Sequence, residues 1–137
     1  MYYYAHIEED EEGYLVSFPD LPSINTFGDT IEEALSNATE ALNACLESDF
    51  QRGFSLPSLS SDKRNDFYSI QVLPHIEIAY TLRKLRKGRS QVEIASELGI
   101  SYQAYQKLEN PRKCNPTVKT LEKISAILGR NLEIKLA

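Results

Sequence analysis

The side chains with the clearest binding chemistry lie in the segment Tyr102–Lys107. Gln103 and Gln106 each carry an amide that donates and accepts hydrogen bonds, a pattern that can read an adenine edge in the major groove of DNA. Lys107 can contact guanine or a backbone phosphate, while Tyr102 is either a further contact or a packing residue. These side chains serve one ligand only if they share the outer face of a helix.

A series of helices is predicted around this segment. Ser90 with Glu93 three residues later is a capping-box signature, and Ser101 and Thr117 are good N-cap residues for two further helices. Gly99 permits a tight turn before Ser101. Apolar residues recur at helical spacing, which places one side of each helix in a common core. The predicted helices span residues 76–87, 91–98, 102–109 and 118–128.

Residues 91–110 resemble the helix-turn-helix of the phage-repressor (Cro/Xre) class. The small Ala95 stands where two helices cross closely, and Gly99 stands in the turn between them. The resemblance implies that Gln91 anchors a phosphate at the positive end of its helix and that Tyr105 belongs to the core. The other predicted core positions are Ile94, Leu98, Ile100 and Leu108.

The same resemblance implies an interface with double-stranded operator DNA. Arg112 and Lys113, in the loop after the candidate recognition helix, add cations for backbone phosphates, as does Lys119. The loop Asn110–Lys113 departs from the glycine that the family often has after this helix. The predicted DNA-binding residues are Gln91, Ser101, Tyr102, Gln103, Gln106, Lys107, Arg112 and Lys113.

Charge divides the 137-residue chain into two unlike halves. Residues 1–74 contain 14 Asp or Glu and 3 Lys or Arg, which gives a net charge of −11. Residues 75–137 contain 6 Asp or Glu and 12 Lys or Arg, which gives a net charge of +6. Pro74 marks the predicted boundary. Such asymmetry favours two modules, 1–74 and 75–137, whose partners carry opposite charge.

The acidic half is predicted to be an α+β module. Aromatic and apolar residues indicate strands at 2–7, 14–18, 23–27 and 67–73, with a charged turn at 8–13 and a loop at 51–66. Thr30 with Glu33 opens an amphipathic helix that reaches at least Leu46. At the far end of the chain, Asn131–Ala137 alternates apolar and charged residues and predicts a short C-terminal strand.

Short motifs stand out in this half, among them Glu-Gly-Tyr at 12–14, Ser-Phe-Pro-Asp-Leu-Pro at 17–22 and Gly-Asp-Thr at 28–30. Together these motifs resemble those of the HicB antitoxins. The resemblance implies a degraded ribonuclease-H-like βββαβ module that binds a HicA-like toxin, a small mRNA-cleaving ribonuclease with a double-stranded-RNA-binding fold. It further implies that the helix-turn-helix half represses the toxin–antitoxin operon. The motifs are Glu12-Gly13-Tyr14, Ser17-Phe18-Pro19-Asp20-Leu21-Pro22, Gly28-Asp29-Thr30, Glu32-Glu33-Ala34 and Ala41-Leu42.

Catalysis and cofactor binding are not expected. Ribonuclease-H chemistry needs carboxylates that converge on two metal ions, one of them from the middle of the first strand, but the predicted strand 2–7 contains none. Neither His6 nor His75 has a partner at metal-ligand spacing, and Cys45 and Cys114 lack CxxC spacing. No stretch is apolar enough for a membrane span, so we expect a cytoplasmic protein without cofactors.

The preferred hypothesis is an antitoxin that neutralises a HicA-like toxin and represses its own operon as a homo-oligomer, a dimer or a tetramer. The C-terminal strand is predicted to pair across the two-fold axis, since a lone strand needs a partner. The alternative is a one-component transcription regulator whose first half senses a small ligand in a concave apolar pocket. An enzyme is the third hypothesis, and it requires metal-dependent nuclease activity.

Overall fold

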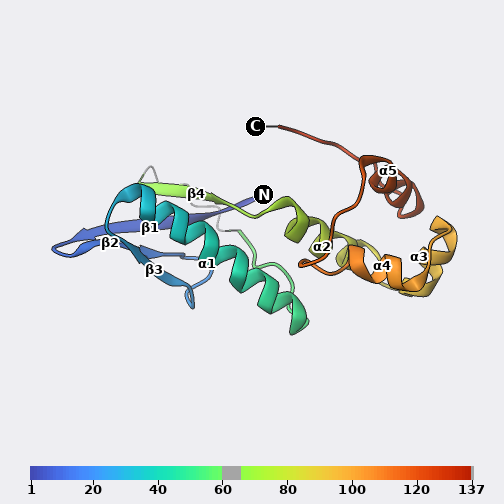
Figure 1. The fold of residues 1–137 in the computed structure, drawn as a ribbon, viewed down its shortest axis with the longest axis horizontal. Coiled ribbons are helices and arrows are strands. Elements are labelled where there is room, and N and C mark those ends of the chain that lie inside the picture. Colours follow the sequence, from blue (N-terminus) through green and yellow to red (C-terminus); the bar gives the residue numbers. More distant parts are fainter. Residues whose placement is uncertain (60–65, 137) are drawn as a thin grey trace. The chain divides into compact units, whose positions relative to one another are not determined.

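The computed structural model describes residues 1–59 and 66–136 of the chain. Two compact units are present, Met1–Pro74 and His75–Ala137 (Figure 1). The protein is α+β: the described part of the first unit contains a four-stranded antiparallel sheet and a long helix, and the second unit is helical.

The elements of the first unit follow one another in the order β-β-β-α-β. The sheet has the strand order β3-β2-β1-β4, and all three ladders are antiparallel. Helix α1, Ile31–Gln51, packs against β2, β3 and β4 on one face of this sheet (Figure 1). The strands are β1 (Tyr2–Asp10), β2 (Gly13–Ser17), β3 (Asn25–Gly28) and β4 (Phe67–Gln71).

Strand β1 is longer than the sequence pattern predicted. Its end, Glu8–Asp10, was expected in a turn but pairs with β2, so that Asp10 lies opposite Gly13. The Asp10 carboxylate accepts hydrogen bonds from the backbone N–H groups of Glu12 (2.8 Å) and Gly13 (3.0 Å). The acidic side chains stay exposed, so their hydration does not oppose the ladder. The predicted long loop is therefore a tight hairpin turn.

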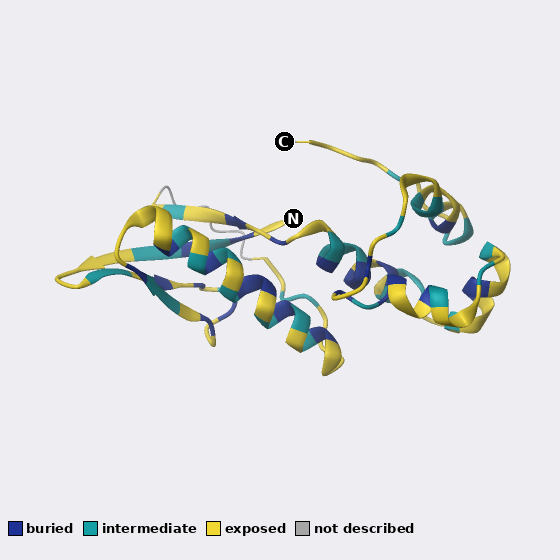
Figure 2. Cartoon of the chain, in the orientation of Figure 1, coloured by how far each residue is buried: buried dark blue, intermediate teal, exposed yellow. Residues whose placement is uncertain are grey.

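Helix α1 begins where the sequence predicted it and comes unusually close to β3. The Thr30 hydroxyl accepts a hydrogen bond from the backbone N–H of Glu33 at 3.1 Å, which caps the helix. A Cβ on Gly28 would lie 2.3 Å from the backbone nitrogen of Ala34. The Gly-Asp-Thr motif thus combines a residue without a side chain at the strand–helix crossing with a capping residue. Figure 2 shows buried positions recurring along α1.

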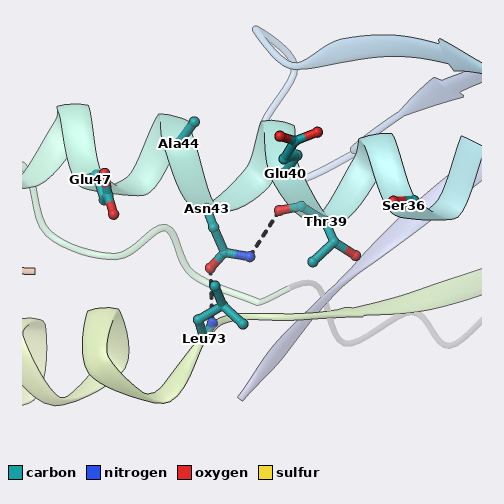
Figure 3. A pocket seen from close by; sticks show the side chains of 7 residues that line it. All are labelled: Ser36, Thr39, Glu40, Asn43, Ala44, Glu47 and Leu73. Carbon is teal, nitrogen blue, oxygen red and sulfur yellow. Dashed lines mark hydrogen bonds between the residues drawn. The ribbon is translucent and has the colours of Figure 1, made fainter. Parts of the chain in front are cut away.

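A buried asparagine joins α1 to the chain that follows β4. Asn43 Nδ2 donates to the carbonyl oxygens of Thr39 (2.9 Å) and Gln71 (3.1 Å), and Asn43 Oδ1 accepts from the backbone N–H of Leu73 (2.8 Å), as Figure 3 shows in part. The bonds to Gln71 and Leu73 satisfy backbone groups at the end of β4, and the bond to Thr39 lies within α1. The end of β4 is thereby held against the helix.

The loop predicted at 51–66 is partly described. Residues 52–59 have no helix or strand apart from a turn at the end of α1, and the Tyr3 hydroxyl donates to the carbonyl oxygen of Pro57 at 2.7 Å. The rest of that prediction, at positions 60–65, lies outside the described residues.

The second unit contains four helices among its described residues. Three of them, α3 to α5, are capped by Ser90, Ser101 and Thr117, the residues that the sequence indicated. Each cap accepts a backbone N–H three residues later, as a capping residue must. The helices are α2 (Pro74–Leu85), α3 (Gln91–Leu98), α4 (Tyr102–Leu108) and α5 (Val118–Ile127). Their shared core contains Leu82, Ile94, Ala95, Tyr105, Leu108 and Ile124, with Leu98 and Ile100 packed against it.

The predicted C-terminal strand is not formed in the single chain. Residues 131–136 have no helix or strand assignment, and Ala137 lies outside the described residues. A strand needs a neighbouring backbone to complete its hydrogen bonds, and the described residues provide none for this segment. The segment leaves Ile134 and Leu136 exposed.

Candidate nucleic-acid interface

Helix α4 is held by the three-residue turn, 99–101, that follows α3. Gly99 has a φ of 70° and ends α3 in the left-handed conformation, which costs glycine little because it lacks a Cβ. The Ser101 hydroxyl accepts from the N–H of Ala104 at 3.0 Å and caps α4. Ser101 therefore positions the helix, and this capping bond uses one of the two lone pairs of its hydroxyl oxygen.

The two faces of α4 are clearly different. Tyr105 and Leu108 point into the core, as predicted for Tyr105. The opposite positions are exposed, so one turn and a half of helix presents amide, ammonium and phenol groups to solvent. The exposed residues are Tyr102, Gln103, Gln106 and Lys107.

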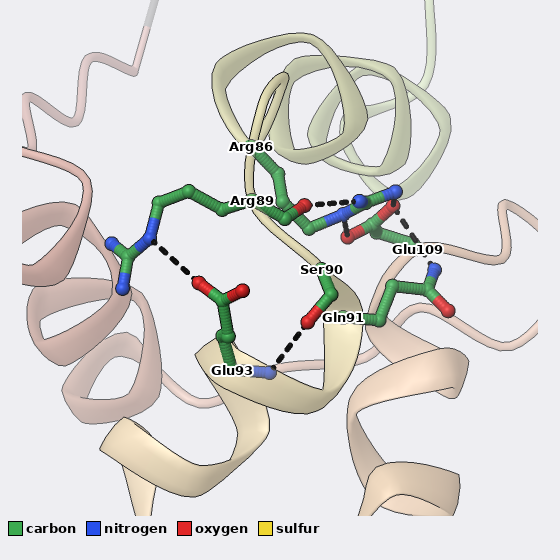
Figure 4. A network of polar contacts seen from close by, with 6 residues as sticks. All are labelled: Arg86, Arg89, Ser90, Gln91, Glu93 and Glu109. Carbon is green, nitrogen blue, oxygen red and sulfur yellow. Dashed lines mark hydrogen bonds and ion pairs between the residues drawn. The ribbon is translucent and has the colours of Figure 1, made fainter.

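Gln91, the first residue of α3, is fixed by a charged network that the sequence analysis missed (Figure 4). Its Nε2 donates to Oε1 of Glu109 at 3.2 Å. Arg86 contacts the same carboxylate in a two-pronged arrangement, Nε to Oε2 at 2.6 Å and Nη2 to Oε1 at 3.0 Å. Arg86 Nη1 also donates to the carbonyl oxygen of Arg89 at 2.8 Å. The network links the end of α2, the start of α3 and the end of α4.

This network is largely enclosed by protein. The Glu109 side chain is 2% exposed and the Arg86 side chain 20% exposed. The hydrogen bond to Glu109 raises the pKa of Arg86, and burial together with the Glu109 carboxylate raises the pKa of Tyr105. The Arg86 guanidinium therefore stays charged and the Tyr105 phenol stays neutral at neutral pH. Gln91 keeps one amide N–H and its carbonyl oxygen for a further ligand.

The loop after α4 keeps its shape without a glycine. Asn110 Oδ1 accepts from the N–H of Arg112 at 3.0 Å, and the Asn110 carbonyl oxygen accepts from the N–H groups of Lys113 (3.0 Å) and Cys114 (2.8 Å). Arg112 and Lys113 are exposed, whereas Cys114 is buried. Burial raises the pKa of the Cys114 thiol to about 11, which keeps it protonated despite the basic neighbours.

Not every cation of this unit is offered to a ligand. Arg89 forms ion pairs with Glu93, at 3.7 Å, and with Glu97, and it donates to the carbonyl oxygen of Ile127 at 3.3 Å (Figure 4 shows the Glu93 contact). These contacts tie α3 to the end of α5. Arg89, which is not among the predicted DNA-binding residues, therefore has its contacts within the fold.

A signal for the missed network was present in the sequence. Tyr105, Leu108 and Glu109 stand at positions i, i+3 and i+4 of one helix, so they share a face. A carboxylate on the apolar face of a helix must be paired when it is buried. Its partner, Arg86, is 23 residues away in the sequence. The spacing of residues therefore could not identify Arg86 as the partner.

The described part of the first unit, 1–59 and 66–74, offers no comparable cationic surface, since Arg52 is its one Lys or Arg. Its residues 1–51 contain 12 Asp or Glu and no Lys or Arg. Among residues 1–59 and 66–136, no cluster of three or more His, Cys, Asp or Glu could hold a metal ion. A groove beside α1 is lined mainly by polar side chains (Figure 3). The lining residues are Ser36, Thr39, Glu40, Asn43, Ala44, Glu47 and Leu73.

Comparison with known protein families agrees with this two-unit organisation. The family model described as "HicB_like antitoxin of bacterial toxin-antitoxin system" matches residues 2–77, more than half of the chain. The chain belongs to the HicB-like antitoxin family. A second model, described as "Helix-turn-helix", matches residues 80–135 of this HicB-like protein. The second match includes the whole of α3 and α4.

Curated relatives of this HicB-like protein carry the same family name. "Antitoxin HicB 2" of Photorhabdus laumondii subsp. laumondii is 30% identical over 134 residues, which is 98% of this chain and 95% of the relative. "Antitoxin HicB 1" of the same organism is 29% identical over 127 residues, 93% of this chain and 81% of the relative. An uncharacterized 14.9 kDa protein from the rep-hol intergenic region of Haemophilus phage HP1 is 40% identical over 57 residues, 42% of this chain and 43% of that protein.

None of the helices within 1–59 and 66–136 combines the length and the apolar composition that crossing a membrane requires.

Proposed function

We propose that this HicB-like protein is an antitoxin that neutralises a HicA-like, mRNA-cleaving toxin by direct binding and represses its own operon. The observation that carries the proposal is the opposite chemistry of the two units. The first has 12 acidic residues and no Lys or Arg in positions 1–51, whereas the second exposes amides and cations on α4 and in the loop after it. A toxin that grips RNA phosphates must be cationic, and an acidic surface attracts it.

The first unit acts in this proposal as a binding module and not as a nuclease. Its β-β-β-α-β order is the order that the ribonuclease-H-like interpretation requires. The middle of β1, Tyr4–His6, carries no carboxylate, and the acids of that strand gather at its hairpin end. That placement leaves no carboxylate where the first metal ligand of a ribonuclease-H site would stand.

The second unit reads DNA through α4. Gln103 and Gln106 face solvent and can each make a bidentate contact with adenine, while Tyr102 and Lys107 flank them. Gln91, held by Glu109, contacts a phosphate beside the start of α3. Arg112 and Lys113 add backbone contacts, and Ser101 orients the helix that carries the reading residues.

Co-purification tests the antitoxin function directly. The tagged full chain is expected to retain a small basic protein when it is isolated from its native cells, and mass spectrometry identifies that protein. The retained protein, freed from the complex under denaturing conditions and refolded, is expected to cleave mRNA. Adding back the full chain should stop the cleavage. A chain that retains no basic protein, or one that leaves the cleavage unchanged, contradicts the proposal.

The chain acts as a dimer in this proposal, joined through residues 131–137. Leu132, Ile134 and Leu136 alternate with Glu133 and Lys135, which suits a strand with one apolar side. The described residues of a single chain supply no neighbouring strand for it. Two-fold symmetry would match the palindromic sites that proteins of this class read, with half-sites about one helical turn apart.

Deletion of residues 131–137 is therefore expected to halve the mass of the free protein in light scattering. A strand that loses its apolar side loses the contact, so Ile134→Lys should have the same effect. Glu133→Gln, on the other side of the strand, serves as the control and should leave the mass unchanged. An unchanged mass after the deletion would show that the dimer contact lies elsewhere.

The runner-up function is a transcription regulator with a ligand-sensing first unit. It requires a concave apolar pocket with a few converging polar groups. The groove beside α1 has five polar side chains and only Ala44 and Leu73 as apolar ones. The groove is open to solvent and its lining includes the carboxylates of Glu40 and Glu47, so it is not an enclosed apolar pocket.

A further inference from the structure

The sheet of the first unit has one face that α1 does not cover. The ladders place Tyr3, Ala5 and Val16 on the helix-covered face, where they are buried. Successive side chains of a strand point to opposite faces of the sheet, and residues directly opposite in a ladder point to the same face. The residues next to these three in the sequence, and the residues paired with those neighbours, therefore point away from α1. Those neighbours are Tyr2, Tyr4, His6, Leu15, Phe27 and Phe67, which we name the aromatic face.

The aromatic face is partly open to solvent and its rings touch. Tyr2 is 40% exposed and Leu15 is 46% exposed. The rings of Tyr2 and Tyr4 meet edge to face, 5.4 Å between centroids, and His6 meets Phe67 in the same way at 5.4 Å. Such edge-to-face contacts hold the rings in fixed positions. A preformed group of aromatic side chains at the surface is typical of a protein-binding site.

The charge around the aromatic face restricts what can bind there. Glu8 lies opposite Leu15 on the same face, and Glu11 and Glu12 follow at the hairpin turn. Positions 1–51 supply no Lys or Arg. Nucleic acid is repelled by such a surface, and a second copy would bring like charges together. A basic protein fits, because arginine side chains stack on tyrosine rings and pair with carboxylates.

We infer that the aromatic face is the surface on which the first unit seats its toxin. The inference rests on the proposed antitoxin function and names the part of the first unit that performs it. The partner is a basic protein that places arginine or lysine side chains over Tyr2 and Tyr4 and toward Glu8. Leu15 and the remaining rings exclude water from that contact.

The double variant Tyr2→Ser/Leu15→Ser tests the apolar part of this surface. The probe is the small basic protein that co-purifies with the wild-type full chain. Loss of two exposed contacts is expected to weaken its binding about 10- to 100-fold in calorimetry. The matched control is Tyr68→Ser, because Tyr68 is 38% exposed on β4 but lies on the helix-covered face, opposite Ala5. The control should bind as the wild type does.

A charge variant tests the same surface without removing any apolar contact. Ser17 is exposed on β2 and pairs with His6, so it borders the aromatic face. Ser17→Lys should weaken binding of the basic protein, and added salt should reduce the difference. Ser17→Glu has a comparable side chain of opposite charge and should bind at least as tightly as the wild type. Unchanged thermal melting of each variant shows that the fold is retained.

The possible outcomes distinguish a wrong location of the toxin site from a wrong antitoxin function. If the double variant and Ser17→Lys bind the basic protein as the wild type does, the aromatic face is not the toxin site and the inference falls, while the antitoxin function stands. If the wild type retains no basic protein, the proposed function falls and takes the inference with it. If the double variant instead turns a dimer into a monomer, the face joins two copies of this chain and the inference is overturned.

Discussion

Replacement of Glu109 by alanine should lower the free energy of unfolding of the helical unit by about 3 kcal/mol, the lower end of the range for breaking a buried ion pair. The change leaves Arg86 without its two-pronged partner in a place where its side chain is only 20% exposed. Partial access to water keeps the loss from being larger. Gln91 loses its acceptor in the same step.

Amide hydrogen exchange in α3 and α5 measures this loss separately from the sheet, because the core amides of a unit exchange only when that unit opens. Glu93→Ala is the matched control, since it also removes a carboxylate from an arginine but at a site where the Glu93 side chain is 60% exposed. An exposed pair of this kind contributes about 0–1 kcal/mol.

The double variant Arg86→Met/Glu109→Leu should recover most of the stability, because apolar residues of similar size commonly replace a buried ion pair without loss. Single and double variants with equal losses would show that the network does not act as a pair.

Much of the fold could be predicted from local patterns. Thr30, Ser90, Ser101 and Thr117 each cap the helix that the sequence assigned to them, because a capping residue acts within three positions of itself. The helices of the second unit were found for the same reason, since apolar spacing reports the buried side. Such local signals needed no knowledge of the rest of the chain.

Local patterns were not sufficient where the structure of a residue depends on a distant part of the chain or on another chain. Strand β1 continues through Glu8–Asp10 because β2 lies opposite, although the acidic run alone is typical of a turn. The segment Asn131–Leu136 has the alternation of a strand but no pairing strand among residues 1–59 and 66–130 of the same chain. At both places the conformation that the local sequence favours differs from the one that strand pairing allows, and strand pairing determines the structure.

In the candidate site, too, local patterns predicted some features and long-range contacts were missed. Spacing placed Gln103, Gln106 and Lys107 on the exposed face of α4, and the helix-turn-helix resemblance placed Tyr105 in the core. It could not show that Gln91 is held by Glu109, since that contact joins residues 18 positions apart. The aromatic face escaped notice because Tyr2 and Tyr4 read as ordinary strand residues until the ladders showed which side α1 covers.

Gln103→Ala is expected to weaken binding to the operator by about 1–3 kcal/mol, or roughly 5- to 150-fold, if its amide makes a bidentate contact with adenine. Binding to a scrambled duplex of the same length should hardly change, because nonspecific binding depends on phosphates and not on base edges. The DNA upstream of the gene's own operon serves as the probe, and titrations by fluorescence anisotropy measure both affinities. The selectivity ratio should therefore fall while the nonspecific affinity stays constant.

Lys113→Ala should behave in the opposite way, because Lys113 lies exposed in the loop after α4, where the proposed function assigns it a contact with a backbone phosphate. We expect weaker binding to both duplexes alike and a salt dependence whose slope falls by about 1, the value for one lost phosphate contact. Lys123→Ala removes an exposed cation outside the proposed contact set and controls for net charge. Equal losses on both duplexes from Gln103→Ala and Lys113→Ala would mean that α4 does not read the bases.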